Sequence, residues 1–119
     1  MRNFREMKIW IKGIELANQV YRLVGQFPSS EEYGLKSQIR RAAVSIPSNI
    51  AEGSSRNSET EFKRYLEIAL GSSFEVETDF IVASNLGMIE EKDLTQFFTN
   101  LSILQKQINA LISKIKSNR

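Results

Sequence analysis

The hydrophobic residues of this chain recur at steps of three and four positions along nearly its whole length, which is the spacing of amphipathic helices. The pattern predicts helices over residues of about 4–26, 30–53, 59–86 and 90–117, and it predicts no strand. Long amphipathic helices with short connections pack as antiparallel neighbours. The expected fold is therefore all-α, an antiparallel up-down-up-down four-helix bundle.

The length and composition of the chain fit one such bundle. The 119 residues are enough to bury one hydrophobic core, and 41% hydrophobic with 25% charged residues is usual for a globular domain. No internal repeat, low-complexity segment or long linker divides the sequence. Residues 1–119 are therefore expected to form a single domain.

Each predicted helix has a hydrophobic face for the core. The core face of the first helix is expected to comprise Trp10, Ile14, Ala17, Val20, Tyr21 and Val24, extended sideways by Ile9, Leu16 and Leu23. The third helix has a heptad pattern: Phe62, Leu66, Ala69, Ser73, Val76, Phe80 and Ala83. Five aromatic residues at helical spacing are expected in the core rather than on a base-stacking surface: Trp10, Phe74, Phe80, Phe97 and Phe98.

The ends of the helices are marked by capping residues. Three helices are expected to begin with a capping box, in which Ser or Asn precedes Glu by three positions: Asn3–Glu6, Ser29–Glu32 and Ser58–Glu61. Two glycines are expected to end helices: Gly53, as a left-handed residue after the second helix, and Gly87 after the third.

The second helix contains Pro47, which removes one backbone hydrogen bond at a cost of roughly 3 kcal/mol. Its outward side also carries short side chains, although Lys, Glu and Gln would suit a solvated helix better. We therefore expect a second subunit to pack there, through Ser37, Arg41, Ser45, Pro47, Ser48 and Glu52. Gly71-Ser72-Ser73 in the third helix predicts another close helix approach. Alternatively, Pro47 only bends the second helix, or ends one helix and starts another.

The composition excludes several chemistries. The chain has no cysteine and no histidine, so it has no disulfide, no thiolate nucleophile and no Cys or His metal ligand. The acidic third helix lacks the Glu-x-x-His pattern of di-iron bundles. We therefore predict no enzyme activity, no catalytic residue, no metal and no cofactor. The N-terminal residues lack the apolar core of a signal peptide, and no run is long enough to span a membrane, so a cytoplasmic protein is expected.

Charge is unevenly distributed along the chain. The net charge is only +2, but residues 1–28 carry +3, residues 29–57 carry +1, residues 58–87 carry −4 and residues 88–119 carry +2. Clustered Lys and Arg bind phosphates by releasing counterions. The candidate nucleic-acid-binding residues are Lys36, Arg40, Arg41, Arg56, Lys63 and Arg64. The alternative for Arg40 and Arg41 is an ion pair with Glu52, Glu67 or Glu75.

The sequence also resembles a known family. The segments YGLKSQIRRAAVSIPSNIAEGSSR and SETEFKRYLEIALGSSFEVET carry the resemblance, and so do Trp10 and Phe27-Pro28. They are similar to four-helix bundle proteins encoded in intervening sequences of bacterial large-subunit ribosomal RNA genes. The chain also resembles the accessory variability proteins of diversity-generating retroelements. These resemblances imply a ring-shaped homo-oligomer, a homopentamer, that binds nucleic acid and cooperates with a reverse transcriptase.

Two functions are consistent with these observations. The first is a non-enzymatic homo-oligomer that binds RNA or DNA through sequence-independent phosphate contacts. The second is a protein-interaction scaffold, a ring that docks a protein partner such as a reverse transcriptase and has no direct role with nucleic acid.

Overall fold

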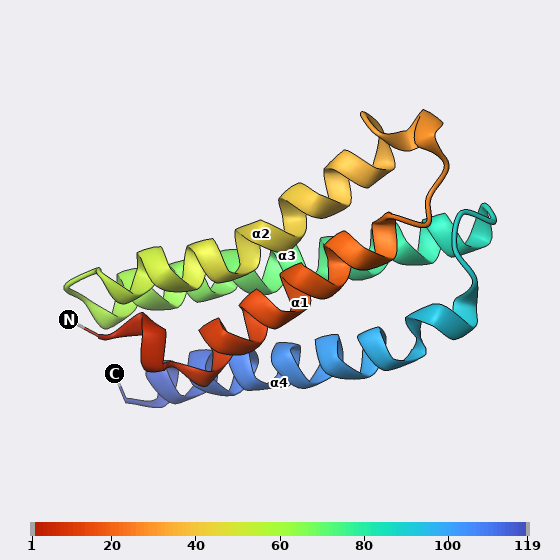
Figure 1. Ribbon diagram of the computed structural model, residues 1–119. Coiled ribbons are helices and arrows are strands. Elements are labelled where there is room, and N and C mark those ends of the chain that lie inside the picture. Colours follow the sequence, from red (N-terminus) through yellow and green to blue (C-terminus); the bar gives the residue numbers. More distant parts are fainter. Residues whose placement is uncertain (1, 119) are drawn as a thin grey trace.

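The computed structural model describes residues 2–118, which form four long helices in up-down-up-down order (Figure 1). The helices are α1 (Lys8–Val24), α2 (Leu35–Ser54), α3 (Glu59–Asn85) and α4 (Thr95–Ser117), joined by short connections. Residues 2–118 contain no strand. The expected all-α fold of four helices is therefore confirmed. Among the described residues, no helix is both long enough and apolar enough to cross a membrane.

The core lies along the central axis of the bundle, between all four helices. α2 packs most extensively against α3 and then against α1, and α4 packs against α3 and α1. All seven heptad residues of α3 are buried, which confirms that part of the prediction: Phe62, Leu66, Ala69, Ser73, Val76, Phe80 and Ala83. The ring of Phe80 makes edge-on contacts with the rings of Phe27 and Phe97, so α3 and α4 share an aromatic centre with the α1–α2 connection.

α1 is rotated relative to the expected core face. Its buried residues are Ile9, Gly13, Leu16, Ala17, Val20 and Val24, whereas the expected core residues Ile14 and Tyr21 are exposed and Trp10 is half-buried. The reason is a close approach between α1 and α2. A Cβ atom added at Gly13 would lie 3.3 Å from the Cβ atom of Pro47, so Gly13 must face α2.

Pro47 lies inside one continuous helix, α2, so the alternative that it ends one helix and starts another is wrong. Its ring is buried against Gly13 of α1 in the same chain. Another expectation about core aromatics is also wrong, because Phe74 on α3 is 49% exposed. Phe80 and Phe97 are buried as expected, and Phe98 is partly buried against the core.

The expected start of the first helix is wrong. Asn3 caps only a short 3-10 helix (Phe4–Glu6), where its side-chain oxygen accepts a hydrogen bond from the backbone N–H of Arg5. Met7 is extended and separates this turn from α1. The turn is held by an edge-on contact between the rings of Phe4 and Trp10, 5.2 Å apart, which folds the N-terminal segment back onto α1.

The start of the second helix is wrong as well. Ser29–Glu31 forms a 3-10 helix, and α2 begins only after Gly34, whose ψ of −120° is not helical. Glu31, rather than Ser29, caps the first turn of α2. Its carboxylate accepts a hydrogen bond of 3.1 Å from the backbone N–H of Leu35. Glu32 is left free for basic partners.

The two ends of α3 agree with the sequence signals. The side chain of Ser58 accepts a hydrogen bond from the backbone N–H of Glu61, as in a capping box. Gly87 has φ +79° and ends α3 in a Schellman motif, in which the N–H of Met88 donates to the carbonyl of Ala83. α4 then begins at Thr95, after a 3-10 helix over Glu91–Leu94.

Gly53 does not end α2 in a left-handed conformation, so that prediction is wrong. It lies within the helix and is buried. A Cβ atom at Gly53 would lie 2.5 Å from the Cβ atom of Tyr65 on α3. The glycine is therefore needed for the contact between the two helices rather than for a turn.

Candidate nucleic-acid interface

The structure separates five of the six predicted phosphate-binding residues into two groups and leaves Arg41 apart from both. Lys36 and Arg40 lie in the first two turns of α2, where both contact Glu32. The Nζ atom of Lys36 is 3.0 Å from one carboxylate oxygen of Glu32, and Nη2 of Arg40 is 2.8 Å from the other. The hydrogen bond from Arg40, and then that from Lys36, lowers the pKa of the Glu32 carboxyl. These two cations are already partly neutralised within the chain.

The expected acceptors of Arg40 are wrong. The sequence suggested Glu52, Glu67 or Glu75, but the guanidinium reaches back eight residues to Glu32, which the 3-10 turn before α2 places beside it. Arg41 points elsewhere and is exposed, and it makes no ion pair with any residue between 2 and 118.

The second group, Arg56, Lys63 and Arg64, lies around the turn between α2 and α3. Arg56 is 3.0 Å from the carboxylate of Glu52, and it also donates a 2.7 Å hydrogen bond to the hydroxyl of Tyr65. Its guanidinium lies 4.9 Å from the centre of the Tyr65 ring, which adds a cation–π contact. The side chain of Arg56 is therefore held in one orientation.

The other two members of this group differ in their contacts. Lys63 forms a 3.6 Å pair with Glu67 one turn further along α3. Arg64 is exposed and makes no ion pair within the described part of the chain. The turn between α2 and α3 thus carries one oriented arginine and one arginine without a carboxylate partner.

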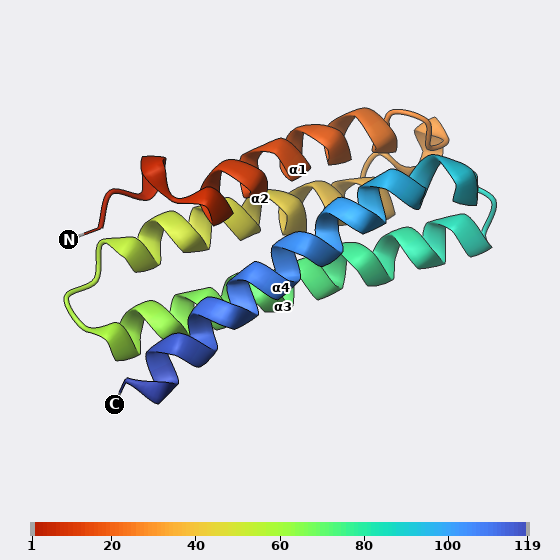
Figure 2. The same cartoon turned by 90° about the horizontal axis from the view of Figure 1, so that it is seen from below.

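The fold brings further basic residues to this end of the bundle. The N-terminal segment, the α2–α3 turn and the last turn of α4 lie at the same end in both ribbon views (Figures 1 and 2). We call this the basic end and define it by eight residues: Arg2, Arg5, Lys8, Arg56, Lys63, Arg64, Lys114 and Lys116. Four acidic residues lie in the same segments: Glu6, Glu52, Glu59 and Glu61.

Arg2 joins the N-terminal segment to the α2–α3 turn. Its guanidinium pairs with Glu59 and lies 4.0 Å from the centre of the Phe62 ring, and its backbone N–H donates to the carbonyl of Ser54. Five basic-end residues are exposed and without an ion pair to any described residue: Arg5, Lys8, Arg64, Lys114 and Lys116. The basic end therefore carries more cations than its own carboxylates neutralise.

The opposite end of the bundle has the opposite charge. The connections there contain five acidic residues: Glu31, Glu32, Glu90, Glu91 and Asp93. Four basic residues accompany them, namely Arg22, Lys36, Arg40 and Lys92. The molecule is therefore polarised along its 46 Å length. The bundle prediction itself could have revealed this polarity, because four alternating helices return the two ends of a chain to one end of a bundle.

The predicted interface residues of α2 fall into two kinds of environment. Ser45 and Pro47 have partners within the chain: the hydroxyl of Ser45 lies 2.9 Å from that of Ser72 on α3, and Pro47 is buried against α1. Arg41, Ser48 and Glu52 are exposed and Ser37 is partly buried, so their side of α2 is open to solvent in a single chain.

Asp79 is the most buried ionisable side chain of the described chain, with 7% of its surface exposed. Its carboxylate accepts a 3.1 Å hydrogen bond from the side-chain amide of Gln38, across the contact between α3 and α2. Burial, and then the charge of Glu75, raises the pKa of Asp79. No cluster of three or more acidic residues suited to a metal ion is found between residues 2 and 118. Asp79 therefore belongs to the packing of α2 against α3.

Comparison with known proteins agrees with this architecture. A crystal structure of a protein of unknown function from the S23 ribosomal protein family of Bacteroides thetaiotaomicron superposes with a TM-score of 0.80 at 23% sequence identity. The match covers 87% of this chain and 97% of that one, which shows a common fold. No curated protein matches the sequence. The family model of the 23S rRNA-intervening sequence protein matches residues 5–110. The chain belongs to the 23S rRNA-intervening sequence protein family.

Proposed function

We propose that this protein is a non-enzymatic homo-oligomer of the cytoplasm that binds RNA or DNA through the basic end of its bundle. The observation that carries the proposal is the set of five exposed, unpaired cations there: Arg5, Lys8, Arg64, Lys114 and Lys116. They come from three separate segments of the chain, so the fold gathers them. A cluster of this kind binds phosphates without reading base sequence.

The oriented side chain of Arg56 supports the same site. Its guanidinium is held by Glu52 and the Tyr65 hydroxyl, so less side-chain freedom is lost when it contacts a phosphate. Lys36 and Arg40 contribute less to the proposed site, because both already share the carboxylate of Glu32. In a homo-oligomer, five subunits as the resemblance implies, each subunit would contribute one basic end.

The proposal is tested by fluorescence anisotropy with labelled single-stranded RNA and duplex DNA at two salt concentrations. The test variant is Lys114→Gln with Lys116→Gln at the basic end. The matched control is Arg22→Gln with Lys92→Gln at the opposite end, which changes the net charge equally. Only the first variant is expected to weaken binding. Its salt dependence on duplex DNA should fall by about 0.9 in slope for each lost phosphate contact.

Three results would contradict this function. They are no binding at low salt, binding that does not respond to salt, and an equal loss of affinity in the variant and its control. The second candidate, a scaffold that docks a protein partner such as a reverse transcriptase, is favoured by exposed hydrophobic residues on α1, α2 and α3. This second candidate predicts weak affinity for nucleic acid, and it predicts that the protein partner is retained by this chain in a pull-down.

A further inference from the structure

A pocket of about 290 Å³ lies at the basic end, between the N-terminal segment and the last turn of α2. Residues 2–5 form one side of this pocket, and Ala51, Ser54 and Ser55 form the other. Ligand pockets usually measure about 300–1,000 Å³, so this one suits a single small group. We call it the N-terminal pocket.

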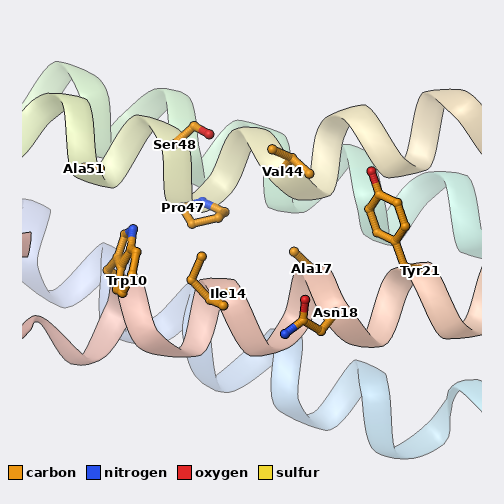
Figure 3. Close-up of a pocket in the computed structure, with 9 residues that line it drawn as sticks. All are labelled: Trp10, Ile14, Ala17, Asn18, Tyr21, Val44, Pro47, Ser48 and Ala51. Atoms are coloured by element: carbon orange, nitrogen blue, oxygen red, sulfur yellow. The ribbon is translucent and has the colours of Figure 1, made fainter. Parts of the chain in front are cut away.

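The wall of the N-terminal pocket contains a pair of stacked side chains. The guanidinium of Arg5 lies over the Phe4 ring, 4.5 Å from its centre. The Phe4 ring is fixed by its edge-on contact with Trp10, which lines the neighbouring groove between α1 and α2 (Figure 3). Nucleic-acid bases stack on aromatic rings and on the plane of a guanidinium. Arg5 and Phe4 therefore offer a flat surface on which a base can continue the stack.

The two arginines of the pocket differ in their partners. The guanidinium of Arg2 pairs with Glu59, so its charge is already neutralised. Arg5 is exposed and makes no ion pair with any residue between 2 and 118. A guanidinium forms strong hydrogen bonds with phosphate oxygens. The pocket thus has one free positive charge, which suits one phosphate group.

The α2 side of the pocket offers hydrogen-bond acceptors. The hydroxyls of Ser54 and Ser55 donate hydrogen bonds of 2.6 and 2.7 Å to the carbonyls of Ala51 and Glu52. Their protons are therefore engaged, but each hydroxyl oxygen keeps a lone pair that can accept. Ser55 is exposed, so a ligand can reach its oxygen. The N–H groups of a base would find an acceptor there, whereas a simple anion would not gain from it.

We infer that the N-terminal pocket takes one unpaired nucleotide of a single strand, with its base stacked on Arg5 and Phe4 and its phosphate at the guanidinium edge of Arg5. A base inside a duplex is paired and stacked, and extracting it costs free energy. The basic end therefore prefers single-stranded to duplex nucleic acid. The inference rests on the nucleic-acid binding proposed above and names the form of nucleic acid that this end selects.

The test measures fluorescence anisotropy with a short labelled RNA of mixed sequence, once as a single strand and once annealed to its complement. Phe4→Leu removes the ring and keeps a hydrophobic side chain, and Arg5→Gln removes the free charge. The control for Phe4→Leu is Phe98→Leu, because Phe98 is also partly buried but lies on α4. The control for Arg5→Gln is Lys8→Gln, because Lys8 is an exposed cation of the basic end that does not line the pocket.

The wild type is expected to bind the single strand more tightly than the duplex. Phe4→Leu should weaken single-strand binding about fivefold or more, which is the lower range for the loss of one stacked base, and should leave duplex binding unchanged. Arg5→Gln should weaken single-strand binding more than duplex binding, whereas Lys8→Gln should weaken both equally. Phe98→Leu should change neither.

A competition experiment separates a nucleotide from a simple anion. Adenosine monophosphate should displace the single strand from the wild type, and inorganic phosphate at the same ionic strength should not. Equal displacement by the two compounds would show a site for an anion only and would overturn the nucleotide pocket.

The remaining contrary results are distinct. Equal affinity of the wild type for the two RNA forms, or an equal effect of Phe4→Leu on both forms, would overturn the pocket and leave phosphate binding by the basic end intact. Failure of the wild type to bind either form at low salt would overturn the proposed function as well. If Phe4→Leu loses the helical circular dichroism of the wild type, the comparison of Arg5→Gln with Lys8→Gln decides.

Discussion

The inner and outer faces of α3 use small residues in different ways. On the inner face, the contact with α2 includes Gly53 against Tyr65 and the hydroxyls of Ser45 and Ser72 at 2.9 Å. Each small side chain there has a neighbour that explains it. On the outer face, Gly71 has open space where a side chain would be. The small residues on the inner face of α3 thus contact neighbours in the same chain, whereas Gly71 on the outer face has no such neighbour.

This difference separates two reasons for a glycine in a helix. Gly53 is required by a contact that the folded chain itself makes, so its replacement acts on folding. Gly71 is not required by any described residue, so its replacement causes no clash within the folded chain. The first two predictions test this distinction and the third tests the polar contact between α3 and α2. All stabilities are compared at one low protein concentration to limit association.

The largest effect is expected for Gly53→Ala. The added methyl group would lie 2.5 Å from the Cβ atom of Tyr65, which belongs to the body of α3 and cannot rotate away. The two helices must move apart, and overpacking of this kind costs about 1–3 kcal/mol of the free energy of unfolding. Urea denaturation measures the loss. Ser48→Ala on the exposed side of α2 is the control, and a stability of Gly53→Ala equal to that control would refute the close contact.

A smaller effect of opposite sign is expected for Gly71→Ala. The new methyl group meets no neighbour, and alanine favours the helix over glycine by about 1 kcal/mol. The free energy of unfolding should therefore rise by about that amount in urea denaturation. A loss of stability would mean that the outer face of α3 is packed within the chain.

The smallest effect is expected for Asp79→Asn, and it depends on pH. Burial and Glu75 raise the pKa of Asp79, so the folded state binds the proton more tightly than the unfolded state. Stability is then lost as pH rises from the unfolded pKa of Asp79 through its folded pKa. Asparagine can still accept the hydrogen bond from Gln38 and carries no charge. We expect Asp79→Asn to melt at higher temperature than its parent at neutral pH and to match it below both pKa values. A constant difference at all pH values would contradict this reasoning.

Local signals in the sequence predicted those features that depend on nearby residues. The heptad of α3 predicted its buried face because the residues from Phe62 to Ala83 keep one spacing throughout. Ser58 and Gly87 predicted the ends of α3 because a cap and a left-handed glycine act within one turn. These are short-range effects, and the fold of four helices follows from them together with the hydrophobic pattern.

Features that depend on a neighbouring helix were not predictable in this way. α1 has hydrophobic residues around much of its circumference, so the pattern could not say that Ile14 and Tyr21 would remain outside. The contact between Gly13 and Pro47 decides that rotation. Glu32 was expected to cap α2, but the non-helical Gly34 delays the helix and leaves Glu32 to bind Arg40.

The candidate site was predictable only in part. Arg56, Lys63 and Arg64 are close in sequence, and all three were among the predicted phosphate-binding residues. Arg5 and Lys116 lie more than a hundred positions apart, and only the alternating direction of the four helices brings them to one end. Their exposure depends on which carboxylates the turns place nearby, and that is a property of the folded chain.

The most direct test asks whether another copy covers the exposed outer face of α3 in the proposed homo-oligomer. The chain has no cysteine, so Thr78→Cys on the exposed outer face of α3 provides a single thiol, and Ala110→Cys on α4 provides an exposed reference. The rate of thiol labelling is measured over a range of protein concentrations. We predict that Cys at position 78 is labelled slowly at high concentration and faster on dilution, while the reference does not change. Equal and concentration-independent rates at both positions would contradict the account.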